Sequence, residues 1–211
     1  MKKLLYLLLI TPLFFISSCE EQGPIHGCSD SQALNYNSEA SIDNNSCEYL
    51  QIEIGSIFQG GIVFYVDETG EHGLVAALED MEGAYEWGCF ELEVDGADET
   101  SIGTGYQNTI DIVGQNCQTQ NGEITAAQTS LNYESEGYSD WYLPSKDELD
   151  EMYNTIGNGS LEGNIGGFAY TWYWSSSENN LSGAWSVFFM DGYSYGGNKN
   201  PALLVRVVRT F

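Results

Sequence analysis

Oxygen-bearing side chains crowd into the segment GCSDSQALNYNSEASIDNNSCEY, residues 27–49. Calcium takes roughly six to eight oxygen ligands from carboxylates, amides and carbonyls, so this composition suits a hard cation. The candidate ligands are Asp30, Asn35, Asn37, Asp43 and Asn45. Asp and Asn also hydrogen-bond the nearby backbone in tight turns, so a cysteine-bounded spacer is the alternative interpretation. Calcium is the one cofactor that the sequence suggests.

Two polar stretches near the C-terminal end, ENNLSG and DGYSYGGNKN, could contact a ligand. Tyrosine supplies rigid amphipathic area, and Asn, Ser and Gly supply adaptable hydrogen bonds, as in antibody paratopes. The candidate contact residues are Asn179, Asn180, Tyr193, Tyr195, Asn198 and Lys199. Ordinary solvated turns have a similar composition, and that interpretation stays open.

Nucleophilic and metal-dependent catalysis are poorly supported. A serine triad needs a histidine base, and the chain has only His26 and His72, which fall in a polar tether and an expected turn. There is no G-x-S-x-G elbow and no C-x-x-C pair typical of zinc sites. Carboxylates are so plentiful that no glycosidase pair stands out. We therefore expect a protein that is not an enzyme.

The N-terminal residues MKKLLYLLLITPLFFISSC have the layout of a secretory signal. Lys2 and Lys3 precede an apolar run of about a dozen residues, too short to span a bilayer comfortably. ISSC resembles the lipobox of bacterial lipoproteins, which implies cleavage after residue 18 and lipidation of Cys19. The alternative is an ordinary signal peptide with a coincidental cysteine. We expect an exported protein held at the outer membrane, facing the cell surface, by a lipid anchor.

Export implies an oxidising compartment, where cysteines form disulfides. If Cys19 carries lipid, four cysteines remain, and four allow three connectivities. Their order in the chain favours two local bridges, Cys28 with Cys47 and Cys89 with Cys117.

The charge balance limits the partners. Without Lys2 and Lys3, four basic residues face 31 acidic ones, a net charge of −27. Nucleic acids and sulfated polysaccharides are bound through Lys and Arg, so both are disfavoured. A glycan of another kind, or a protein, remains as the expected ligand. Solubility at a crowded surface is the simplest use of the charge.

Local patterns predict an α+β domain that follows the cysteine-bounded segment. A hairpin is expected from two apolar runs, 62–66 and 74–78, around a polar turn. Residues 124–131 form a short helix candidate, and SKDELDEMYNTIG a better one, with Ser145 and Glu148 as a capping box. The chain closes with the strand LLVRVVRTF. The expected divisions are a leader at 1–18, a tether at 19–26, the Asx-rich repeat at 27–49 and one domain at 50–211.

Large aromatic residues are expected to build the core of this domain. Trp174 and Trp185 are predicted to be buried. Strand alternation over WSVFFM places Val187 and Phe189 on one face and Phe188 on the other. One of Arg206 and Arg209 is predicted to pair with an internal carboxylate such as Asp140 or Glu178, and Arg206 is predicted to be a structural ion-pair residue.

Several separated motifs, among them GGIVFYVDETGEHGLVAA, EWGC, IGTGYQNT, YSDWYLPSKDEL, YWSSSE and RVVR, occur in an order that resembles the DUF1566 or Lcl C-terminal domain family. The resemblance runs from about residue 52 to 211. It implies a fold similar to C-type lectins and formylglycine-generating enzymes, in exported or cell-surface proteins. The calcium-site motifs of C-type lectins are missing here. Residues 27–49 resemble the short cysteine-bounded repeats of Bacteroidetes proteins, which are similar to thrombospondin type 3 calcium repeats.

The sequence therefore predicts a surface lipoprotein whose C-type-lectin-like domain binds a glycan or protein ligand in adhesion. Two alternatives are kept. One is a structural component of the envelope or matrix without a soluble ligand. The other is an enzyme that acts on envelope glycans.

Overall fold

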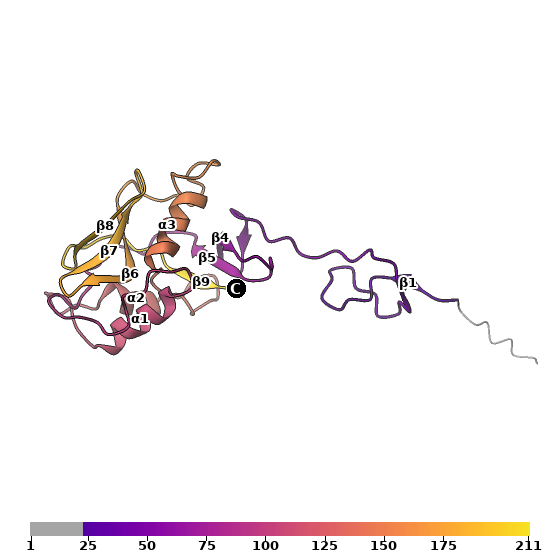
Figure 1. Cartoon of the computed structure of the whole chain (residues 1–211), viewed down its shortest axis with the longest axis horizontal. Coiled ribbons are helices and arrows are strands. Elements are labelled where there is room, and N and C mark those ends of the chain that lie inside the picture. Colours follow the sequence, from indigo (N-terminus) through magenta and orange to yellow (C-terminus); the bar gives the residue numbers. More distant parts are fainter. Residues whose placement is uncertain (1–22) are drawn as a thin grey trace, which may run out of the picture. The chain divides into compact units, whose positions relative to one another are not determined.

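The computed structural model describes residues 23–211, so Cys19 and the expected leader lie outside the described residues. The described chain divides into two compact units, one that ends at Leu50 and one that spans Gln51–Phe211. Figure 1 shows both units.

The first unit is a small loop structure closed by a disulfide. Strands β1 (His26–Gly27) and β2 (Ile42–Asp43) pair in parallel. Cys28 is bonded to Cys47 with their Cα atoms 4.8 Å apart, which confirms the first predicted bridge. Only Cys28 and Ala33 are buried apolar residues here, so the disulfide is the main constraint on this segment. Closing a loop of this length stabilises a fold by about 3 kcal/mol.

The second unit contains an antiparallel sheet of order β3-β4-β5-β9. Its strands are β3 (Ile57–Phe58), β4 (Gly61–Val66), β5 (Gly73–Ala77) and β9 (Val208–Thr210). β4 and β5 form the predicted hairpin. In its turn, Asp67 accepts hydrogen bonds from the backbone N–H groups of Thr69 and Gly70, both 3.0 Å long. Gly70 has a φ of +77°, which glycine adopts without steric cost.

Helix α3 (Lys146–Thr155) begins where its sequence predicts. The Ser145 hydroxyl accepts from the Glu148 backbone N–H at 3.2 Å, and the Glu148 carboxylate accepts from the Ser145 N–H at 2.8 Å. This reciprocal capping box satisfies two donors that the helix itself cannot use. Helix α2 (Ala126–Leu131) falls within the other predicted helix and is capped by the Thr125 hydroxyl.

Helix α1 (Gly105–Gly114) lies in a stretch that carries no predicted helix. The hydroxyl of its N-cap residue, Thr104, makes no capping bond. Instead the Glu148 carboxylate of α3 accepts from the Gly103 N–H at 2.8 Å. A side chain at Gly105 would place its Cβ 2.3 Å from that same carboxylate. The start of α1 therefore depends on a residue that lies some forty positions later in the chain.

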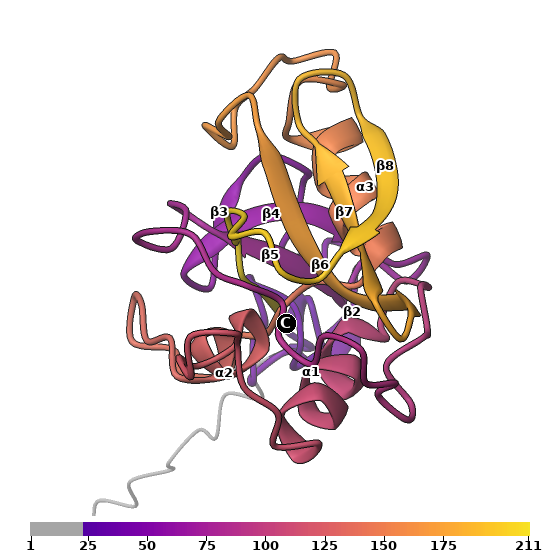
Figure 2. The ribbon, with the colours of Figure 1, turned by 90° about the vertical axis from the view of Figure 1, so that its left-hand side faces the viewer.

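A second antiparallel sheet has the order β6-β7-β8. It consists of β6 (Trp172–Asn180), β7 (Gly183–Phe188) and β8 (Tyr193–Asn198). Figure 2 looks onto this sheet, with α3 behind it. The register pairs Trp172 with Phe188 and Phe188 with Tyr193. The described residues thus form a mixed α+β fold with three helices and antiparallel sheets in the second unit.

The second predicted disulfide, Cys89–Cys117, is also confirmed, with Cα atoms 5.1 Å apart. Cys89 belongs to a core cluster that includes Trp87, Trp141 and Trp174. This bridge ties the long segment before α1 to the segment after it.

The two C-terminal arginines both form internal ion pairs, and one of them, Arg209, has a partner suggested from the sequence, Asp140. Arg206 pairs with Asp80 at 2.7 Å, whereas Asp140 pairs with Arg209 at 2.7 Å. Glu178 pairs with Lys199. The Arg209 guanidinium hydrogen-bonds the Asp140 carboxylate and so lowers its pKa. Only Val208–Thr210 is strand, so alternation along one long C-terminal strand could not assign these partners.

Candidate ligand-binding surface

Four aromatic side chains gather on the sheet β6-β7-β8. Trp172, Phe188 and Tyr193 occupy one cross-strand row, and Tyr195 follows Tyr193 by two residues on β8. Residues two apart on a strand point to the same face. We call Trp172, Phe188, Tyr193 and Tyr195 the aromatic surface.

The rings of the aromatic surface contact one another. Trp172 stacks on Phe188 with ring centres 5.0 Å apart. The Trp172 ring centre lies 6.3 Å from that of Tyr193 and 6.1 Å from that of Tyr195. The two tyrosine rings are nearly parallel at 6.4 Å, close to the spacing of alternate strand residues. Tyr193 is 60% exposed and Tyr195 53% exposed.

The opposite face of this sheet packs on α3. The Ser194 hydroxyl, between the two tyrosines, donates to Asp150 of α3 at 2.6 Å. Lys146 of α3 lies 5.7 Å from the ring centre of Trp185. In both Figure 1 and Figure 2, α3 lies along one side of the sheet, whereas α1 packs against β6 at its edge. The aromatic surface therefore faces away from α3.

The two tryptophans expected in the core, Trp174 and Trp185, differ in how deeply they are buried. Trp174 is buried, and its indole N–H donates to the Tyr85 carbonyl at 2.8 Å. Trp185 is only partly buried, and it lies on β7 beside the half-buried Lys146 at the start of α3. Val187 and Phe189 are buried while Phe188 is partly exposed, as alternation predicts.

Lys199 does not belong to the candidate contact residues, and that prediction is wrong. Its side chain is fully buried. The ammonium donates to the carbonyl oxygens of Cys89 (3.2 Å) and Leu92 (2.8 Å) and to the Glu178 carboxylate. It also lies 4.6 Å from the ring centre of Trp87. Burial lowers the pKa of Lys199, and the Glu178 carboxylate opposes that change.

The remaining contact candidates are exposed and lie at two places on the sheet. Tyr193 and Tyr195 belong to the aromatic surface. Asn179, Asn180 and Asn198 lie near the β6–β7 turn, where Gly183 pairs with Asn198. The side-chain carbonyls of Asn180 and Asn198 accept from backbone N–H groups two residues on, at 3.0 and 3.1 Å.

Trp172 and Phe188 are not among the contact candidates named from the sequence. Neither stands out as polar or loop-like, and both lie in aromatic runs that also supply the core. Only the register of three strands brings them beside the tyrosines.

The candidate calcium ligands of the first unit are engaged in local hydrogen bonds. Asp30 accepts from the Gln32 N–H (3.0 Å) and the Tyr49 hydroxyl (2.7 Å), and these bonds lower its pKa. The side-chain oxygens of Asn35, Asn37 and Asp43 accept from the backbone N–H groups of Glu48 (2.9 Å), Glu39 (3.0 Å) and Asn45 (2.7 Å) respectively. Asn45 takes a turn conformation with φ +57°. These contacts match the spacer alternative, and calcium binding stays a prediction.

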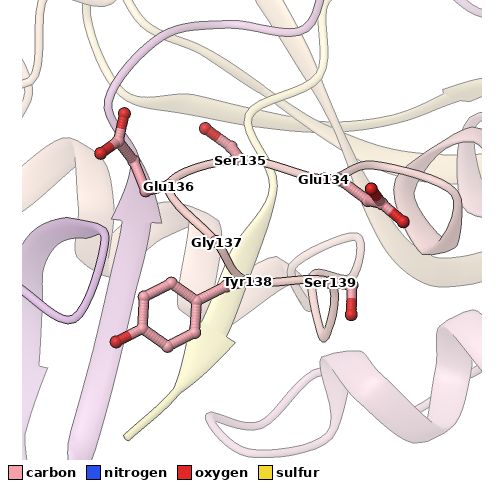
Figure 3. A pocket seen from close by; sticks show the side chains of 6 residues that line it. All are labelled: Glu134, Ser135, Glu136, Gly137, Tyr138 and Ser139. Carbon is pink, nitrogen blue, oxygen red and sulfur yellow. The ribbon is translucent and has the colours of Figure 1, made fainter.

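The second unit also has hollows away from the aromatic surface. One of about 330 Å³ is lined by the loop 134–139, whose side chains point in different directions in Figure 3. Another of about 400 Å³ is lined by Glu93, Asp95, Asp98 and Glu178. Glu178 is already held by Lys199 and by the Val94 N–H at 3.1 Å. Over residues 23–211, no three His, Cys, Asp or Glu side chains are placed to hold a metal ion.

Charge is distributed unevenly along the chain. Every Lys and Arg in residues 23–211 is paired with a carboxylate. From residue 163 to the end, the only acidic residues are Glu178 and Asp191, out of 31 in the sequence. The segment 172–195, which carries the aromatic surface, thus has only two charged residues, Glu178 and Asp191, although the protein is strongly acidic. No helix within the described range is long and apolar enough to span a membrane.

The chain is similar to a protein family and, more distantly, to a solved structure. No curated protein sequence matches the chain. A crystal structure of a fimbrial protein from Bacteroides ovatus ATCC 8483 is similar at 14% identity and a TM-score of 0.43. That match covers 82% of this chain and 47% of the fimbrial chain, so this chain spans about half of its length. The model of the Lcl C-terminal domain matches residues 97–209, more than half of the sequence. The chain therefore belongs to the Lcl C-terminal domain family, as its motifs indicate.

Proposed function

We propose that this protein is a cell-surface adhesion module that binds its ligand through the aromatic surface and catalyses no reaction. One observation carries the proposal: an exposed, uncharged aromatic surface on a sheet whose other face is packed on α3. Exposed apolar area of this kind, rimmed by polar residues, commonly marks a binding site. Asn179, Asn180 and Asn198 supply polar groups at the end of the same sheet.

The finer fold assignment, a C-type-lectin-like arrangement, is part of this proposal. It is supported by family membership and by the mixed α+β architecture. Calcium held by the Asx-rich segment is a separate, untested possibility. Repeating every binding measurement with EDTA separates a cation-dependent interaction from one that needs only the aromatic surface.

We further propose that Cys19 carries the lipid anchor, at the outer membrane and facing outward. Replacing Cys19 with alanine is expected to move the protein from the membrane fraction to the soluble fraction, because the buried acyl chains supply the membrane affinity. Fractionation followed by immunoblotting measures this. Retention of Cys19→Ala in the membrane would contradict lipid anchoring at this residue. Protease added to intact cells should also digest the wild-type protein if it faces outward.

The function is tested by adhesion of cells that display the full chain. Replacing Tyr193 and Tyr195 together with serine should lower adherence roughly tenfold or more, because aromatic anchors dominate binding energy. The control is Tyr106→Ser. Tyr106 is 51% exposed on α1, so the control removes a comparable ring away from the sheet. Circular dichroism and surface immunolabelling verify folding and display.

The outcomes separate the interpretations. Equal adherence of Tyr193→Ser/Tyr195→Ser and wild type would refute the aromatic surface as the binding site. If cells lacking the whole chain also adhere normally, the structural alternative gains support. Turnover of an envelope glycan by the purified chain would instead favour the enzyme alternative and direct attention to the hollow around Glu93, Asp95 and Asp98.

A further inference from the structure

The charge of the aromatic surface differs from that of the rest of the molecule, and this difference limits the chemical class of ligand that the surface can bind. Anionic ligands need Lys or Arg, and each of the four basic residues of the described chain is already paired with a carboxylate. Three of the four are buried as well. An anionic chain would therefore approach an acidic surface on which residues 23–211 offer no unpaired Lys or Arg to offset the repulsion. Cationic ligands would instead favour the acidic regions outside residues 163–211.

The shape of the surface suits flat, uncharged rings. Tyr195 leans over Gly197: a Cβ added at Gly197 would lie 3.0 Å from two carbons of the Tyr195 ring. Tyr193 lies within 20° of the same plane, 6.4 Å away along the strand. Gly197 therefore leaves space that a larger residue would take from the Tyr195 ring. Two neighbouring rings with a common tilt follow the direction of β8.

Hydrogen-bonding groups accompany these rings. In the described chain, neither the Tyr193 nor the Tyr195 hydroxyl has a protein partner, and both tyrosines are more than half exposed. Aromatic rings carry negative charge on their faces, which attracts the weakly positive C–H groups of a sugar ring. The phenol hydroxyls can both donate to and accept from sugar hydroxyls. A protein ligand could also use such a surface. From residue 185 to residue 195, however, the only charged residue is Asp191, whose carboxylate accepts from the Tyr193 backbone N–H at 3.0 Å, and this scarcity of charge favours a partner without charge.

We propose that the aromatic surface binds a neutral polysaccharide, with sugar rings stacked on Tyr193 and Tyr195 beside Trp172. This inference rests on the proposed adhesion function and specifies its ligand. It requires no calcium, because every group it uses is an aromatic ring or a hydroxyl. It also assigns Gly197 a role, namely to let Tyr195 lean along the strand.

The experiment measures retention of the full chain, in detergent, on immobilised dextran, mannan, pullulan and galactan. Dextran sulfate, which has the dextran backbone with added charge, is the matched anionic probe. We expect at least one neutral polysaccharide to bind with EDTA present, and dextran sulfate to bind more weakly than dextran. Tyr193→Ser/Tyr195→Ser should lose at least tenfold in affinity, and Tyr106→Ser should lose none. Gly197→Ala, which keeps both tyrosines, should also weaken binding.

A parallel arm separates this inference from the proposed function. Target cells are treated with periodate, which cleaves sugar diols, or with protease, before adherence is measured. Loss of adherence after periodate supports a glycan ligand. Adherence that survives periodate but not protease, with no neutral polysaccharide bound, overturns the glycan inference and leaves adhesion standing. Dextran sulfate bound as tightly as dextran would overturn the charge argument. Wild-type cells that adhere no better than cells without the chain would end both proposals.

Discussion

Replacing Arg206 with alanine is expected to lower the free energy of unfolding by about 3–5 kcal/mol. This is the usual cost of removing one partner of a buried ion pair, because the other charge is left buried and unpaired. The guanidinium is almost completely buried. Its loss leaves the Asp80 carboxylate without its cation and two backbone carbonyls, of Ala77 and Gly166, without their donor. It also removes the cation that lies 4.3 Å from the ring centre of Phe168.

Arg206 contacts several elements of the second unit, so its loss should destabilise the whole unit rather than one segment. Asp80 also accepts a hydrogen bond from the Tyr173 hydroxyl of β6 at 2.7 Å. Ala77 ends β5, and Gly166 lies in the loop after α3. One side chain thus joins both sheets and the loop that follows α3. Burial and the Asp80 carboxylate raise the pKa of Tyr173, so its hydroxyl stays protonated and continues to donate.

Thermal and urea unfolding of the full chain measure the effect. For a domain of this size, each kcal/mol shifts Tm by roughly 2–4 °C, so a fall of about 10 °C is expected. Lys146→Ala is the control, because Lys146 pairs with Asp147 and Asp150 at the surface. Surface pairs contribute about 0–1 kcal/mol. Arg206→Ala with a Tm no lower than that of Lys146→Ala would show that Arg206 is not a structural residue.

The sequence predicts those elements whose signals are local. The hairpin around Asp67 and the start of α3 at Ser145 are specified by residues within one turn of the chain. Helix α1 could not be predicted in this way. Its first residue is a glycine, and the carboxylate that orders its start comes from Glu148. A helix start that is capped by a residue from another helix cannot be predicted from the residues next to it in sequence.

In the candidate site, too, some residues can be recognised from local sequence and others are brought in only by long-range contacts. Tyr193 and Tyr195 are recognisable because exposed tyrosines among Asn, Ser and Gly are typical of binding loops. Trp172 and Phe188 join them only through strand register, which alternation in single strands does not give. Lys199 was misjudged because a lysine between two asparagines suggests a solvated turn. Its burial depends on Glu178 and Trp87, which are far from it in sequence.

Lys199→Met is the second substitution with a large expected effect, again about 3–5 kcal/mol in the free energy of unfolding. Methionine keeps an unbranched apolar chain of similar length but leaves the buried Glu178 carboxylate without a cation. The carbonyls of Cys89 and Leu92 also lose their donor. Glu178 lies in β6 and Lys199 directly follows β8, so the pair links the outer strands of the sheet that carries the aromatic surface.

A double-mutant cycle separates the ion pair from simple loss of packing. If unpaired charge causes the destabilisation, the double variant Lys199→Met/Glu178→Gln should lose less stability than the sum of the losses measured for Lys199→Met and Glu178→Gln separately. Coupling between residues in contact is typically about 0.5–3 kcal/mol. Strict additivity would mean that Lys199 acts through its apolar stem and Trp87 alone. Binding by those variants that still fold then tests the link to function. If the pair holds β6 and β8 in register, weaker binding should accompany lower stability even though neither residue belongs to the aromatic surface, because Trp172 and the two tyrosines lie on the strands that the pair joins.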